Sequence, residues 1–126
     1  MVTINNRDPR PVYEQVKEGF KRLIIAGVLS ADEKMPSVRE LAGQLAINPN
    51  TIQRAYAALE EEGYLTAEPG KGNFAAKAGA GDTARRDTLL AQLDATAAEL
   101  IFLGMTTEEL AERVSKAKTG KGGDEA

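Results

Sequence analysis

Apolar positions along the chain predict an amphipathic helix close to the N-terminus. They recur at intervals of three and four residues, at Val12, Val16, Phe20, Leu23, Ile24 and Val28. This spacing places them on one face of a helix. Pro9 and Pro11 suit the entry to such a helix and Gly27 suits its exit. We therefore expect a first helix between Pro11 and Gly27, after a polar start.

Two shorter helices are predicted next, after a polar loop over residues 30–34. Ser37 and Glu40 have the spacing of a capping box, which starts a helix at Ser37. Asn48 is a good N-cap, and Pro49 is a good first residue for another helix, which Gly63 can end. The apolar residues expected to face inward are Val38, Leu41, Ala42, Leu45, Ile52, Ala55, Tyr56 and Leu59. Two short helices joined by a tight turn form a helix-turn-helix.

A hairpin is predicted after the third helix. Residues 64–68 and 73–76 are candidate strands, and they flank Pro69-Gly70-Lys71-Gly72, a turn rich in Gly and Pro. A helix-turn-helix followed by a hairpin is a winged helix. We therefore expect residues 1–77 to form a winged helix-turn-helix domain.

The C-terminal part predicts two more helices beyond a flexible linker at residues 77–81. A leucine-rich stripe, widened by Leu90, Ile101 and Phe102, indicates a long helix that starts near residue 82 or 83 and stops at Gly104. The stripe consists of Leu89, Leu93, Ala97, Leu100 and Leu103. A second capping box, Thr106 to Glu109, opens a helix to about residue 118. The fold class expected is mainly α with a small β-hairpin, with a helical region at 82–118 and a disordered tail at 119–126.

Composition excludes most enzyme chemistry. The 126 residues contain neither Cys nor His, which removes thiolate nucleophiles, Cys/His zinc sites and imidazole catalysis. The acidic pairs Glu61-Glu62 and Glu108-Glu109 lie at predicted helix ends, where carboxylates serve capping or solvation. We expect no enzyme, metal or cofactor. The longest apolar run, residues 23–29, is far short of the roughly 20 residues that span a bilayer, and no signal-type segment is present, so we expect a cytoplasmic protein.

The net charge of −3 is unevenly distributed. Residues 1–77 hold 10 basic and 10 acidic residues, whereas residues 78–126 hold 6 and 9. In the first segment Glu60-Glu61-Glu62 lies at the far end of the third helix, whereas Arg39, Arg54 and Lys71 lie in the helix-turn-helix and hairpin motifs. Because the field is local, a neutral domain can still bind nucleic acid, with modest non-specific affinity and a dependence on pairing two domains.

Five ordered segments of residues 11–76 resemble the DNA-binding domain of the GntR family of bacterial transcription regulators. They are PVYEQV (11–16), MPSVRELA (35–42), NPNTIQRAY (48–56), LEEEGYL (59–65) and GKGNF (70–74). The short helical remainder resembles the YtrA-type subgroup, in which two C-terminal helices serve dimerisation and no large effector domain is present. The chain departs from the family pattern at Asp32, where Gly is usual, and at Asn73, where Thr is usual. Asp tolerates the left-handed backbone conformation, so we expect the family's turn to form at Asp32 as well.

The resemblance implies that the winged helix contacts double-stranded DNA. Arg39 matches a DNA-contacting arginine of the family, and the first turns of the third helix are expected in the major groove, with Gln53 able to pair with adenine. The complete candidate set is Ser37, Arg39, Asn48, Asn50, Thr51, Gln53, Arg54, Gly70, Lys71 and Gly72. The alternatives are a surface salt bridge of Arg39 with Glu40 or Glu14, a purely capping Asn48, and a merely solvated Gln53 and Arg54.

The combined prediction is a homodimeric transcription regulator, more specifically a repressor, that binds a palindromic operator. A single small domain cannot bury the stripe from Leu89 to Leu103, so we expect two copies to pack through it; folding back onto the same chain is the alternative. Half-sites are then about one helical turn apart. The alternative function is a winged-helix protein-interaction module without DNA binding. No effector is identified by the sequence.

Overall fold

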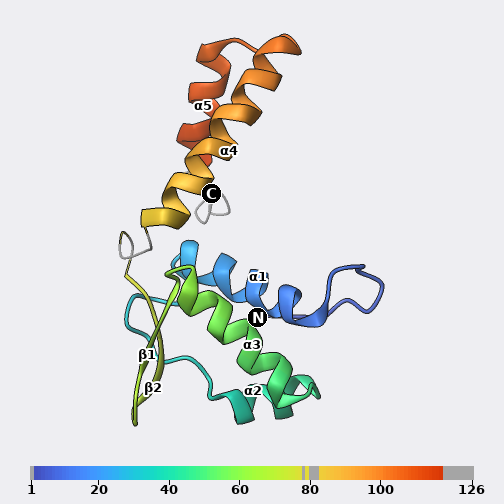
Figure 1. The fold of residues 1–126 in the computed structure, drawn as a ribbon, viewed down its shortest axis with the longest axis vertical. Helices are drawn as coiled ribbons and strands as arrows, with labels where there is room; N and C mark the ends of the chain where they lie inside the picture. Colours follow the sequence, from blue (N-terminus) through green and yellow to red (C-terminus); the bar gives the residue numbers. More distant parts are fainter. Residues whose placement is uncertain (1, 78, 80–82, 118–126) are drawn as a thin grey trace. The chain divides into compact units, whose positions relative to one another are not determined.

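The computed structural model describes residues 2–77, 79 and 83–117. Its elements, in chain order, are α1 (Val12–Ile25), α2 (Val38–Leu45), α3 (Pro49–Glu61), β1 (Leu65–Glu68), β2 (Gly72–Ala75), α4 (Thr83–Phe102) and α5 (Thr107–Ala117) (Figure 1). This confirms the predicted mainly α fold with one hairpin. The chain divides into two compact units between residues 82 and 83. Most of the expected linker, and all of the expected disordered tail, lie outside the described residues.

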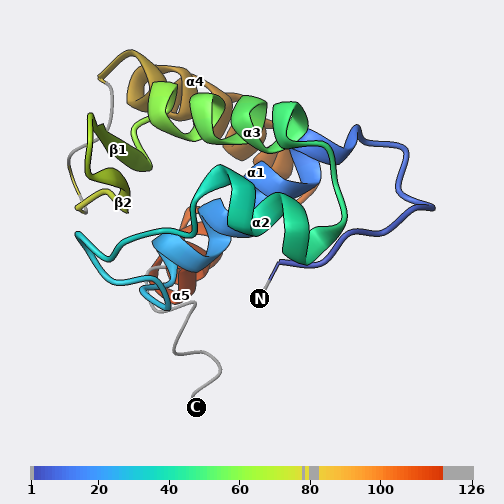
Figure 2. The same cartoon turned by 90° about the horizontal axis from the view of Figure 1, so that it is seen from below.

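The core of the first unit forms where α3 packs against α1, α2 and β1 (Figure 2). Its largest fully buried side chains are Tyr56, Phe20, Leu41, Ile52, Leu59 and Val16. The rings of Phe20 and Tyr56 meet edge to face, with centroids 5.9 Å apart, a favourable arrangement for aromatic pairs. The predicted inward faces of α1, α2 and α3 are therefore the faces that the fold buries or half-buries. The prediction is wrong at Val28, which is 68% exposed because α1 ends at Ile25 and the chain turns away before it.

The N-terminal segment is part of this core, which the polar start of the sequence did not predict. Val2 is only 4% exposed and lies against Gly19, where an added Cβ would come within 3.0 Å of the valine methyl groups. Gln15 is also buried. Its side chain accepts a hydrogen bond from the N–H of Asn5 and donates to the carbonyl oxygens of Asn5 and Arg10. The buried amide is thereby satisfied and holds the segment on α1.

Local capping fixes the starts of α2 and α3 as predicted. Ser37 Oγ accepts from the N–H of Glu40, and the Glu40 carboxylate accepts from the N–H of Ser37, which completes the capping box. Asn48 Oδ1 accepts from the N–H of Asn50 at 2.8 Å. A residue that the sequence did not single out, Ala46, ends α2 in the left-handed conformation with φ 56°.

The wing is a two-stranded antiparallel hairpin in which Leu65 pairs with Ala75 and Glu68 with Gly72. The N–H of Lys71 donates to the carbonyl oxygen of Glu68, so Pro69 and Gly70 occupy the centre of a turn. Gly70 has φ 78°, the conformation that a type II turn requires at its third position, after a favoured proline.

Residues 32–35 pair with β2, where only a loop was predicted. Met35 donates its N–H to the carbonyl oxygen of Asn73, and Asp32 donates its N–H to that of Ala75. Asp32 has φ 66°, which confirms that aspartate adopts the left-handed turn at this position. The segment that leads into α2 is therefore joined to the wing.

The described part of the second unit consists of α4, α5 and the turn between them. Gly104, with φ 112°, follows the end of α4. Thr106 Oγ1 accepts from the N–H of Glu109, and the Glu109 carboxylate accepts from the N–H of Thr106, which confirms the second capping box. No residue of α4 or α5 is buried. Within the described part of the chain, no helix has the length and hydropathy to cross a membrane.

Candidate nucleic-acid interface

Arg39 projects from the first turn of α2 as an exposed cation. The two carboxylates that could have formed a salt bridge with Arg39 make other contacts. The Glu40 carboxylate closes the capping box, and the Glu14 carboxylate lies 3.8 Å from Lys17 and accepts a hydrogen bond from the hydroxyl of Tyr13. Among residues 2–77, no ion pair with Arg39 is formed. Its five N–H donors are therefore available to a phosphate or a guanine edge.

The N-terminal turns of α3 present polar side chains on the surface that the helix does not bury. Asn50 and Gln53 are exposed, and Thr51 is half-buried. The oxygen of Asn48 is used in capping, but its amide N–H₂ donors are not needed for that bond. This arrangement leaves amide and hydroxyl groups free at a helix N-terminus, where hydrogen-bond donors favour a phosphate.

Arg54 lies on the side of α3 that faces the start of α1. Its guanidinium carbon is 3.9 Å from the centre of the Tyr13 ring. The side chain is exposed, as predicted, but the aromatic contact was not expected from the sequence. The two residues are far apart in the chain, and only the packing of α1 against α3 brings them together.

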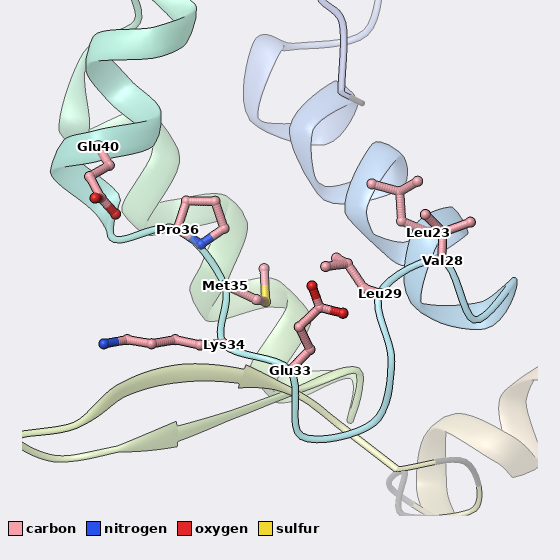
Figure 3. Close-up of a pocket in the computed structure, with 8 residues that line it drawn as sticks. All are labelled: Leu23, Val28, Leu29, Glu33, Lys34, Met35, Pro36 and Glu40. Atoms are coloured by element: carbon pink, nitrogen blue, oxygen red, sulfur yellow. The ribbon is translucent and has the colours of Figure 1, made fainter.

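The wing adds cations from two segments. Gly70 and Lys71 are exposed at the tip. Lys34 lies beside them, because an added Cβ on Gly72 would be 3.1 Å from Lys34 Cε. Figure 3 shows the extended Lys34 side chain beside the hairpin. Lys34 was missed in the sequence because no local pattern indicated that residues 32–35 pair with β2.

Acidic residues lie at the opposite end of α3. Glu62 binds Lys17 of α1 at 2.9 Å and lies 3.9 Å from Lys21. Burial lowers the pKa of Lys17, but the hydrogen bond and charge of Glu62, with the charges of Glu14 and Glu18, outweigh it and raise the pKa above its ordinary value. The cations near the start of α3 thus lack carboxylate partners in the described chain, whereas those at its end are paired.

A cleft of about 640 Å³ lies between the end of α1, the loop after it and the start of α2 (Figure 3). Leu23, Val28, Leu29, Met35 and Pro36 form its apolar lining, and Glu33, Lys34 and Glu40 its charged lining. None of the candidate DNA contacts predicted from the sequence lines it. Across the described residues, no group of three or more Asp or Glu side chains could hold a metal ion.

The predicted dimerisation stripe is divided between exposed and half-buried positions. Leu89, Leu93 and Leu103 are 39%, 51% and 69% exposed, whereas Ala97 and Leu100 are half-buried. Further exposed apolar side chains lie on or next to the same helix, including Ile101 at 47% and Phe102 at 86%. The second unit therefore carries more apolar surface than α4 and α5 cover by themselves.

Comparisons with known proteins place this geometry in a regulator family. Residues 12–74 match the model of the gntR family of bacterial regulatory proteins. The chain is 40% identical over 74 residues to the HTH-type transcriptional repressor YtrA of Bacillus subtilis; the match covers 59% of this chain and 57% of that repressor. It is 35% identical to YhcF, an uncharacterised HTH-type transcriptional regulator of Bacillus subtilis, over 88% of this chain and 93% of the relative.

Solved structures show the same similarity. A transcriptional antiterminator from Listeria monocytogenes EGD-e matches with a TM-score of 0.71 and 31% identity, over 94% of this chain and 92% of that one. The DNA-binding domain of AraR in complex with operator ORE1 matches with a TM-score of 0.52 and 32% identity, over 60% of this chain and 93% of that domain. By its sequence and by its fold, the chain belongs to the gntR family of bacterial regulatory proteins.

Proposed function

We propose that this chain is a sequence-specific, DNA-binding transcription regulator whose winged helix-turn-helix binds an operator. The observation that carries the proposal is the group of exposed cations and amides around the start of α3, which have no carboxylate partners in residues 2–77. The operator complex of the similar AraR domain supports the same use of this fold. The wing and the two helices of the motif then meet the DNA together.

Each side chain has a role set by its chemistry. Arg39 and Gln53 are proposed to contact base edges, because guanidinium and amide groups pair bidentately with guanine and adenine. Ser37, Asn48, Asn50 and Thr51 would bind phosphates. Lys71, between Gly70 and Gly72, and Lys34 beside them would bind the backbone along the wing, where ammonium groups act as point charges.

We further propose a homodimer that binds a palindromic operator. The exposed apolar side chains of α4, Leu89 and Leu93 among them, support pairing with a second copy, since burial of such a surface is the main force for association. Repression follows by analogy with the relatives YtrA and NagR, whose names state that activity. The proposed site of action is the cytoplasm, and no effector or cofactor is assigned.

The direct test of DNA binding is selection of duplexes from a random-sequence pool by the purified protein. We expect enrichment of a palindrome with half-sites about one helical turn apart, and an affinity that falls steeply as salt rises. The absence of any enriched duplex would favour the protein-interaction module. Binding that does not change with salt would contradict the proposed phosphate contacts.

Arg39→Ala tests the base contact. We expect about 5- to 150-fold weaker binding to the selected duplex, equivalent to about 1–3 kcal/mol, because one bidentate pair is lost. Arg22→Ala is the matched control, because Arg22 is an exposed arginine in the last turn of α1, outside the candidate surface. Equal affinity of the Arg39 and Arg22 variants would remove Arg39 from the interface.

Leu93→Glu tests the dimer. We expect sedimentation to show monomers, because a charge in the apolar interface would be desolvated without a partner. Gln92→Glu adds a charge to the neighbouring exposed position of α4 and should leave the dimer intact. If the Leu93 variant remains a dimer with full stability, the assignment of this helix face is wrong.

A further inference from the structure

We propose that Tyr13 is a positioning residue for DNA binding: its ring, at the start of α1, holds the guanidinium of Arg54 on α3 ready for a phosphate. The inference rests on the proposed function and adds to it a residue outside the helix-turn-helix. It starts from the 3.9 Å separation between the Arg54 guanidinium carbon and the centre of the Tyr13 ring.

The Tyr13 ring is a fixed platform. It is half-buried and packs against the hydrophobic core, while its hydroxyl donates a 3.2 Å hydrogen bond to the Glu14 carboxylate. Arg54, in contrast, is exposed on the N-terminal half of α3. The long, exposed side chain of Arg54 is thus held by the ring of Tyr13, which packing and the hydrogen bond to Glu14 keep in place.

The contact leaves the hydrogen-bonding capacity of Arg54 unused. A guanidinium that stacks on a ring is attracted through its flat face, and its five N–H donors lie in its plane. Within residues 2–77, no carboxylate or carbonyl accepts a hydrogen bond from Arg54. The donors are therefore oriented but unpaired. Because the ring already orders the Arg54 side chain in the free protein, less conformational entropy is lost when the side chain binds DNA.

A second cation lies near an aromatic ring in the same domain and shows a different arrangement. Lys21 Nζ is 5.5 Å from the centre of the Tyr64 ring, but it also lies 3.4 Å from Glu18 and 3.9 Å from Glu62. Its charge is neutralised by carboxylates, as expected for a structural contact. Arg54 has the closer ring contact and no carboxylate, which favours an external anion as its partner.

The experiment is a double-mutant cycle measured by fluorescence anisotropy. The probe is a labelled duplex carrying the site that the parent protein selects, titrated at several salt concentrations. The variants are Tyr13→Leu, which keeps apolar bulk without the ring, Arg54→Ala, and the double variant. Tyr13→Phe is the conservative control, because it keeps the ring and loses only the hydroxyl. Circular dichroism melting measures the stability of each variant.

We expect Arg54→Ala to weaken binding and to reduce the slope of log K against log salt by about 0.9, the loss of one phosphate contact. Tyr13→Leu should weaken binding about 2- to 5-fold, the equilibrium factor of an exposed cation–π contact. In the Arg54→Ala background the same change should have no further effect, and Tyr13→Phe should bind as the parent does.

Three results would overturn the inference. If Arg54→Ala binds with the parent affinity and salt slope, Arg54 contacts no phosphate. If Tyr13→Leu weakens binding equally in both backgrounds, Tyr13 acts through the fold and not through Arg54. If Tyr13→Leu binds as the parent does, the ring positions nothing. A parent protein that enriches and binds no duplex would instead contradict the proposed function itself.

Discussion

The hydroxyl of Tyr56 donates a 2.8 Å hydrogen bond to the carbonyl oxygen of Pro36. Tyr56 is a residue of α3 that is 2% exposed, and Pro36 immediately precedes Ser37, the N-cap of α2. Burial, with a smaller contribution from the charge of Glu40, raises the pKa of the Tyr56 hydroxyl far above its ordinary value, so the group remains a donor. The bond ties the start of α2, and with it Arg39, to α3.

Tyr56→Phe should destabilise the domain by about 1 kcal/mol, because the half-buried Pro36 loses the hydrogen bond to its carbonyl oxygen while the ring remains in place. Urea unfolding measures the change. Tyr64→Phe is the control: the hydroxyl of Tyr64 forms no hydrogen bond within residues 2–77, so its loss should change stability by less than about 0.5 kcal/mol. Equal losses in the two variants would show that the bond to Pro36 contributes nothing.

Ala46→Gly should stabilise the protein. Ala46 is exposed with φ 56° and ψ 48°, a left-handed conformation that costs an alanine about 1 kcal/mol or more. Glycine removes that strain but gains entropy in the unfolded chain, so we expect a net gain of about 0.5 kcal/mol. Ala57→Gly, at an exposed position inside α3, should lower stability by about 1 kcal/mol. Thermal melting should therefore show changes of opposite sign.

Lys17→Met should destabilise the domain by about 1 kcal/mol at neutral pH, because it removes the 2.9 Å ion pair with Glu62. The pKa of Lys17 is raised in the folded state, so its ion pair contributes fully below the unfolded pKa of about 10.4 and is lost as pH rises through the higher folded value. Urea unfolding at pH 7 and above pH 11 should show the gap between parent and variant closing. Arg22→Met, which removes an exposed charge without an ion pair in the described chain, should show no such closing.

Gly72→Ala should weaken the wing. Gly72 has φ 119°, and the added Cβ would lie 3.1 Å from Lys34 Cε, so the variant strains the backbone and displaces the lysine stem. We expect a loss of about 1–2 kcal/mol in stability, together with weaker DNA binding. Gly43→Ala, inside α2 with open space around its position, should instead stabilise the protein by about 0.5–1 kcal/mol. A Gly72 variant as stable as the parent would show that the wing adapts freely.

Local interactions explain why much of this fold was predictable. The capping boxes that begin at Ser37 and Thr106 join groups three residues apart, and the turn at Gly70 depends on four consecutive residues. The inward faces of α1 to α3 follow from the spacing of apolar residues within each helix. Such features depend on neighbours along the chain, so a single sequence is enough to predict them.

The burial of Val2 and the polar contacts of Gln15 could not be predicted in the same way. The N-terminal segment is too short to show a period, and its place is decided by the surface of α1, including the absence of a side chain at Gly19. The candidate interface shows the same division. Arg39 and the first turns of α3 were identified from their motifs, whereas Lys34 was not.

The sequence by itself determined the order of elements, the caps that start α2, α3 and α5, and the residues proposed to contact DNA in α2 and α3, because each depends on residues close together in the chain. Tertiary structure alone decided that Lys34 lies beside the wing and that Arg54 stacks on Tyr13. These contacts join residues that are distant in the sequence. They exist because the shared hydrophobic core sets the distance between α1 and α3, and because residues 32–35 pair with β2.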